Sequence, residues 1–96
     1  MTTEAILYIA NPDVSYREEE DGAILFNPDT DEVLVINVTG QLVWQALARP
    51  MSCGGIAAAL IAQCENVPQD QVAQDVDEFV AELLGRGFAG IYEGAA

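Results

Sequence analysis

The segment from Ile24 to Trp44 constrains the fold of this chain more than any other part of the sequence. Within it, the run from Asn27 to Asp31 is a cluster of turn-forming residues. Proline fixes φ, and Asn and Asp side chains hydrogen-bond to the nearby backbone. The flanking runs, Ala23–Phe26 and Val33–Ile36, are apolar and rich in β-branched or aromatic residues, so each predicts a strand. The segment therefore predicts a hairpin.

A further strand precedes this hairpin. Val14–Glu18 alternates apolar and polar side chains, which predicts a half-buried strand. Asp21-Gly22 is typical of a tight hairpin turn. We therefore expect a three-stranded antiparallel meander with strands at about Ser15–Glu18, Ala23–Phe26 and Glu32–Ile36.

Three helices are expected after the sheet, which makes the predicted fold α+β and winged-helix-like. Asn37 or Thr39 would cap the first, at about 38–48, and Ser52 would cap the second. The third, at about Gln69–Arg86, is the clearest, and Gly87 suits its C-terminal cap. Its apolar residues form one stripe: Val72, Val76, Phe79, Val80 and Leu83.

The two ends of the chain leave alternatives open. The apolar run Ile6–Ala10 suits an added strand, a packing arm or a dimer contact, so the role of residues 1–13 is undecided. Phe88–Tyr92 suits a last short strand or a cover for the end of the third helix. The length predicts one domain over residues 1–96, with its core at about 14–88.

The composition excludes several classes of protein. A hydrophobic fraction of 51% excludes general disorder, and no apolar run approaches the ~18 residues of a membrane span. Because Met1–Ala5 carries no basic residue, we expect no secretory signal and a cytoplasmic location. The net charge of −13 would repel nucleic acid and anionic membranes, so neither is an expected partner. This charge either keeps the protein soluble or favours the binding of basic or neutral partners.

Catalytic and metal-binding chemistry finds little support in the residues. The chain has no His, and no Ser or Cys has a candidate base. Asn27, Asp29 and Asp31 imitate the start of a calcium loop, but the required glycine and distal glutamate are missing. Cys53 and Cys64 on one helix would lie roughly 16 Å apart, too far for a disulfide. We expect both to be reduced and buried, with no catalytic residue, metal or cofactor.

Peptide binding is the function that the residues leave open. The third strand would expose unpaired backbone groups beside an amphipathic helix, and an extended peptide can pair with such an edge. Alternatively, Val33–Ile36 is an interior strand, or an edge covered by a second copy of the chain in a homodimer. The residues alone do not separate these possibilities.

An ordered set of short motifs over about Val14–Phe88 resembles the PqqD-like family, also called RiPP recognition elements, which are small winged-helix-type domains. The motifs are Asp21-Gly22, Leu25, Asn27-Pro28-Asp29-Thr30, Ile36-Asn37-x-Thr39-Gly40, Val43-Trp44, Ile56-Ala57-x-x-Leu60 and Asp75-Val76-x-x-Phe79-Val80-x-x-Leu83-x-x-x-Gly87-Phe88. Asp31 stands where such proteins usually have glycine, so a turn of different shape is expected there.

The resemblance implies a non-catalytic function. Such domains hold the leader of a ribosomally made precursor peptide for a modifying enzyme, often a radical SAM enzyme. The leader would add as a strand beside the third strand and lie against the third helix. The peptide-binding residues carried over from the resemblance are Glu32, Val33, Leu34, Val35, Ile36, Val72, Asp75, Val76 and Phe79.

Overall fold

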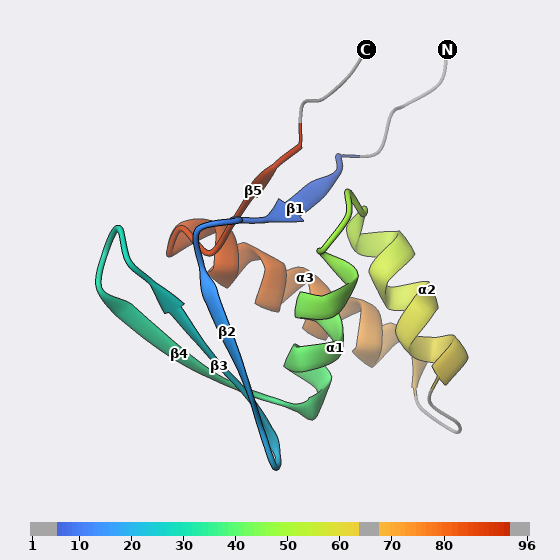
Figure 1. The fold of residues 1–96 in the computed structure, drawn as a ribbon. Helices are drawn as coiled ribbons and strands as arrows, with labels where there is room; N and C mark the ends of the chain where they lie inside the picture. The colour runs from blue at the N-terminus through green and yellow to red at the C-terminus, as the bar shows by residue number, and fades with distance from the viewer. Residues whose placement is uncertain (1–5, 64–67, 93–96) are drawn as a thin grey trace.

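The computed structural model describes residues 6–63 and 68–92 and has an α+β fold (Figure 1). A three-stranded antiparallel sheet, in the order β2-β3-β4, is followed by three helices, as the sequence predicts. The likeness to a winged helix stays a prediction. The elements are β1 (Tyr8–Ala10), β2 (Ser15–Glu19), β3 (Gly22–Asn27), β4 (Glu32–Asn37), α1 (Val38–Ala46), α2 (Cys53–Gln63), α3 (Gln69–Gly85) and β5 (Ala89–Ile91).

Two turn residues fix the register of the meander. Gly22 has a φ of +148°, and a Cβ there would overlap the carbonyl oxygen of Ile36, so this position requires glycine. The β3–β4 pairing runs from Gly22 opposite Asn37 to Asn27 opposite Glu32. Asp31 has a φ of 60°, the left-handed conformation that glycine favours. Asp tolerates this region better than most residues. Whether the turn differs in shape from that of similar proteins stays a prediction.

The N-terminal run forms a strand that pairs with the C-terminal one. Tyr8 lies opposite Ile91 and Ala10 opposite Ala89 in an antiparallel two-stranded sheet. Tyr8 also exchanges two backbone hydrogen bonds with Met51, at 2.7 and 3.0 Å. The run is therefore an added strand, and Phe88–Tyr92 supplies its partner. Figure 1 shows β1 and β5 side by side, apart from the larger sheet.

The helix boundaries follow the capping residues. Asn37 Oδ1 accepts a hydrogen bond from the Gly40 amide at 2.8 Å, and Ser52 Oγ accepts one from the Gly55 amide at 3.0 Å. Gly87 takes a left-handed φ of +80° just after α3. α1 ends at Ala46 rather than near 48. None of the helices in the described ranges is long and apolar enough to cross a membrane.

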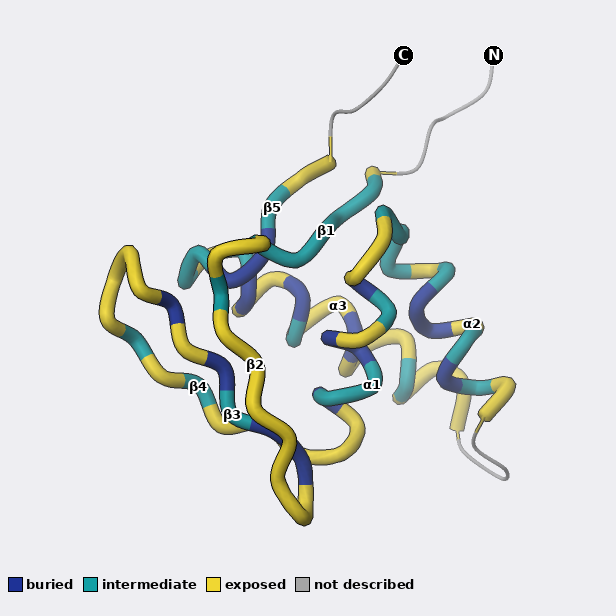
Figure 2. Tube along the Cα trace, viewed as in Figure 1, coloured by how far each residue is buried: buried dark blue, intermediate teal, exposed yellow. Residues whose placement is uncertain are grey.

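One hydrophobic core joins the sheet to the helices. α1 packs against β3, β4 and α2, and α2 packs against α3. Figure 2 shows the buried residues along β3 and on the inward faces of the helices. The core residues with no exposed surface are Leu25, Leu47, Ile56, Leu83 and Phe88.

The prediction that β2 is half-buried is wrong. All residues of this strand are exposed, as the yellow tube of Figure 2 shows. β2 is an outer strand, whereas α1 packs on β3 and β4. Its alternating side chains therefore have little to pack against, although the Tyr16 hydroxyl accepts a hydrogen bond from Gln41 Nε2 at 2.6 Å.

A buried asparagine ties the β3–β4 turn to the end of α3. Asn27 is 1% exposed, and its Nδ2 donates to the carbonyl oxygen of Gly87 at 3.1 Å. Asn11 Nδ2 donates to the same oxygen at 3.0 Å. Asn27 Oδ1 accepts from the Asp29 amide at 3.0 Å, which shapes the turn. The Gly87 carbonyl therefore joins three distant parts of the chain.

Candidate functional site

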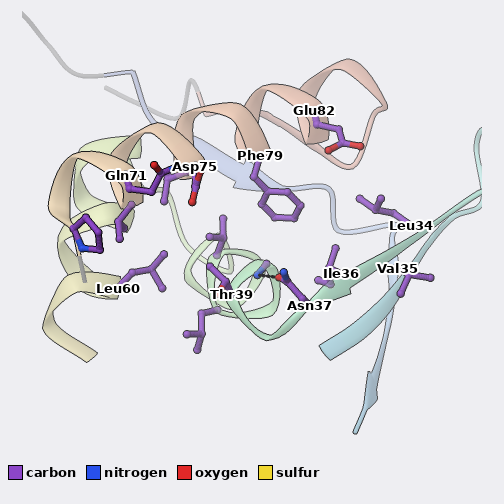
Figure 3. Close-up of a pocket in the computed structure, with 16 residues that line it drawn as sticks. Leu34, Val35, Ile36, Asn37, Thr39, Leu60, Gln71, Asp75, Phe79 and Glu82 are labelled. Carbon is purple, nitrogen blue, oxygen red and sulfur yellow. Dashed lines mark hydrogen bonds between the residues drawn. The ribbon is translucent and has the colours of Figure 1, made fainter. Parts of the chain in front are cut away.

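A groove of about 610 Å³ lies between β4 and α3, with α1 contributing to its wall. Most of the residues that line it are apolar, so it suits an apolar side chain or an amphipathic segment. Figure 3 shows its labelled side chains, which come from β4, α1, α2 and α3. The lining residues are Leu34, Val35, Ile36, Asn37, Thr39, Gly40, Leu42, Val43, Leu60, Pro68, Gln71, Val72, Asp75, Val76, Phe79 and Glu82.

The edge of β4 runs along this groove and has no partner strand among the described residues. β4 pairs with β3 alone. In an antiparallel strand, alternate residues direct their N–H and C=O groups away from the existing partner. The free edge therefore offers a regular row of donors and acceptors beside an apolar surface, which is the arrangement that strand addition uses.

α3 forms the opposite side of the groove with three predicted residues of its apolar stripe. Val76 is buried, whereas Val72 and Phe79 are half-buried and leave surface in the groove. Gly40 on α1 makes room for the Phe79 ring, because a Cβ at this position would lie 3.3 Å from Phe79 Cζ. Gly40 lies one helical turn after the end of β4, and the Phe79 ring packs against it.

Charged residues frame the groove along α3. Asp75 Oδ1 accepts a hydrogen bond from Gln71 Nε2 at 2.9 Å. Glu82 Oε2 lies 3.1 Å from Arg86 Nη1, and Arg86 Nε lies 3.3 Å from Glu32 Oε1. Arg86 therefore links the C-terminal end of α3 to the start of β4.

The structure brings most of the predicted peptide-binding residues to this groove. Those in its lining are Leu34, Val35, Ile36, Val72, Asp75, Val76 and Phe79. Glu32 and Val33 lie outside it, farther along the same strand. Whether any of them contacts a peptide stays a prediction.

Sequence reasoning missed Gln71, Glu82, Thr39 and Leu60, which also line the groove. Gln71 and Glu82 could have been found from helical spacing, since they lie four residues before Asp75 and three after Phe79. Thr39 and Leu60 carry no such signal, because their place depends on how α1 and α2 pack.

The outer face of the sheet carries a second apolar surface. Val33 pairs with Phe26, and Val35 pairs with Ile24, so these four side chains share one face. Val33 is 54% exposed and Val35 is 72% exposed. This outer strip lies directly beside the free edge of β4.

The remaining candidate chemistry is weak. Cys53 is half-buried at the start of α2, and Cys64 lies outside the described residues. Burial, followed by the neighbouring Asp77 carboxylate, raises the pKa of the Cys53 thiol to about 11, so it is protonated and a poor nucleophile near neutral pH. Over residues 6–63 and 68–92, no group of three His, Cys, Asp or Glu side chains is placed to hold a metal ion.

Comparisons with known proteins identify related sequences and folds. The family model described as "Coenzyme PQQ synthesis protein D (PqqD)" matches residues 22–89. The structure "TbiB1 in Complex with the TbiA(beta) Leader Peptide" is similar, with a TM-score of 0.74 and 20% identity over 92% of this chain and 98% of that one. "Lasso peptide synthetase B1 complexed with the leader peptide" is also similar, with a TM-score of 0.72 and 24% identity over 86% and 96%. None of the curated proteins matches the sequence.

Proposed function

This chain belongs to the PqqD family, and we propose that it captures the leader segment of a ribosomally made precursor peptide in the β4–α3 groove. The observation that carries the proposal is the free edge of β4 beside an apolar groove. Two proteins of similar fold have been solved in complex with leader peptides, which supports the same ligand class here.

The proposed mode of binding is strand addition. The peptide backbone pairs with the outward-directed groups of β4, and the peptide becomes a fourth strand of the sheet. Because side chains alternate along a strand, every second peptide residue faces α3 and contacts Val72, Val76 or Phe79. Glu32 and Val33 pair with the part of the peptide that extends beyond the groove.

The domain acts without catalysis of its own in this proposal. It holds the leader while a separate modifying enzyme, such as a radical SAM enzyme, acts on the rest of the precursor. The paired backbone provides affinity and the groove provides selectivity, so the proposed function requires no cofactor in this chain.

The first test compares two substitutions in β4. Fluorescein-labelled peptides would represent the N-terminal halves of short reading frames encoded beside this gene, and anisotropy would measure their affinity. Proline removes a backbone donor and restricts φ, whereas alanine keeps the backbone intact. We expect Val35→Ala to change affinity less than about three-fold and a folded Val35→Pro to weaken it about ten-fold or more.

A second arm leaves the protein unchanged and guards against misfolding of the proline variant. N-methylation of the peptide amides, one at a time, removes single donors. Strand addition predicts loss of affinity at every second residue, because alternate amides face β4. Loss of affinity without this period of two, or full affinity in a Val35→Pro variant whose circular dichroism is native, would contradict strand addition.

A second candidate function is self-association through β4. The exposed outer strip and the free edge favour it, since native proteins usually cover such an edge. Light scattering after size exclusion would separate the candidates. A monomer whose mass rises only by that of the bound peptide supports leader capture, and a dimer that peptide does not dissociate supports self-association.

A further inference from the structure

The side chains that line the groove give it a defined charge. Asp75 and Glu82 are the charged residues among those that line it, and both are acidic. They lie seven residues apart on α3, which corresponds to roughly 10 Å along the helix, and Phe79 lies between them. Figure 3 shows Asp75 and Phe79 projecting from α3 towards α1 and β4.

The two acids differ in what already contacts them. Glu82 has Arg86 at 3.1 Å. Asp75 has the neutral amide of Gln71 at 2.9 Å, and the ion pairs of the described part of the chain involve Arg17 and Arg86 without including Asp75. The Asp75 carboxylate therefore faces the groove without a cationic partner among those residues.

The charge of the whole chain acts in the same direction. It has 16 acidic residues, three arginines and no lysine, which give a net charge of −13. A cationic side chain is attracted to such a surface, and an acidic one is repelled. The attraction strengthens where a bound peptide displaces water from an apolar groove, because the effective dielectric constant falls.

We propose that the groove selects a peptide segment in which a Lys or Arg lies two residues from a large apolar side chain. The basic group pairs with Asp75, and the apolar side chain packs on Phe79. Asp75 and Phe79 are one helical turn apart, about 6 Å, and two residues of an extended strand span a similar length. This inference rests on the proposed function and adds the chemical class of the segment.

The test uses a phage-displayed library of random dodecapeptides, panned against the wild type and two variants. Asp75→Asn removes the proposed charge. Glu78→Gln is the matched control, because Glu78 accepts a hydrogen bond from Gln74 at 3.2 Å on the same helix but lies outside the groove lining. We expect enrichment of Lys or Arg two positions from an apolar residue with the wild type and Glu78→Gln, and its loss with Asp75→Asn.

One selected peptide would then be synthesised with its basic residue intact and with norleucine in its place. We expect Asp75→Asn or norleucine each to weaken binding about ten-fold, and the two together to weaken it little further. If binding peptides emerge without a basic preference, or Asp75→Asn keeps that preference, the inference is wrong while peptide capture stands. If no peptide binds the wild type, the proposed function fails and this inference fails with it.

Discussion

The Gly87 carbonyl oxygen accepts hydrogen bonds from Asn11, which follows β1, and from Asn27, the last residue of β3. Asn27 is the buried donor of the two, and Asn11 is half-buried. Water can take the place of a half-buried side chain such as Asn11, whereas it reaches the groups around a buried side chain such as Asn27 less well. We therefore expect the hydrogen bond from Asn27 to contribute more to the free energy of unfolding than the one from Asn11.

Removal of the Asn27 side chain tests this difference. We expect Asn27→Ala to lower the free energy of unfolding by about 1–3 kcal/mol, because the Gly87 carbonyl and the Asp29 amide both lose a partner. Asn11→Ala, the matched control, should cost less. Urea unfolding followed by the fluorescence of Trp44 measures both. Equal costs for the two variants would show that burial does not set the weight of these bonds.

The Cys53 thiol gives a prediction about pH. Its pKa is raised from the usual 9.0 to about 11, first by burial and then by Asp77. At pH 8 we expect iodoacetamide to label folded Cys53 on the order of a hundred-fold more slowly than the urea-unfolded chain, since the thiolate reacts. Asp77→Asn should speed the labelling. Mass spectrometry of the Cys53 peptide gives the rates, and equal rates in the two states would contradict the shift.

The same shift has a consequence for stability. Because the folded-state pKa of Cys53 lies above the unfolded one, the protonated thiol stabilises the fold. This contribution is complete below pH 9 and is lost as the pH rises through about 11.

At the scale of elements, the apolar stripe of α3 and the β3–β4 hairpin could be predicted because their signals are local. The stripe shows in helical spacing, and the hairpin shows in the residues from Asn27 to Asp31. The β1–β5 pairing and the exposure of β2 could not be predicted, because each depends on which distant element packs nearby. The burial of Asn27 was missed for the same reason.

The alignment of β3 with β4 depends on Gly22 and gives a prediction at this scale. Gly22→Ala should lower the free energy of unfolding by about 2 kcal/mol or more, since its Cβ would overlap the Ile36 carbonyl at a positive φ. Gly85→Ala adds the same methyl group to the last residue of α3, where nothing lies within 4 Å, and should stabilise by up to about 1 kcal/mol. Urea titration compares them, and a neutral Gly22→Ala would show that the strands realign without cost.

At the scale of the whole molecule, the acidic surface predicts that the protein does not bind nucleic acid. Asp70, Asp75, Asp77, Glu78 and Glu82 all lie along α3. We expect a labelled DNA duplex titrated at low salt, where electrostatic binding is strongest, to give no saturable signal. Micromolar binding under these conditions, weakening as salt is added, would contradict this expectation and reopen a nucleic-acid role.

The pairing of β1 with β5 also determines how this domain can be combined with others. The amide of Tyr92 donates to the carbonyl oxygen of Leu7 at 2.8 Å, so the chain enters and leaves the fold at one point (Figure 1). Neither strand lines the groove. Because the two ends lie so close together, residues 6–92 could be inserted into a surface loop of another protein with little distortion of that loop. The groove would stay accessible in such an insertion.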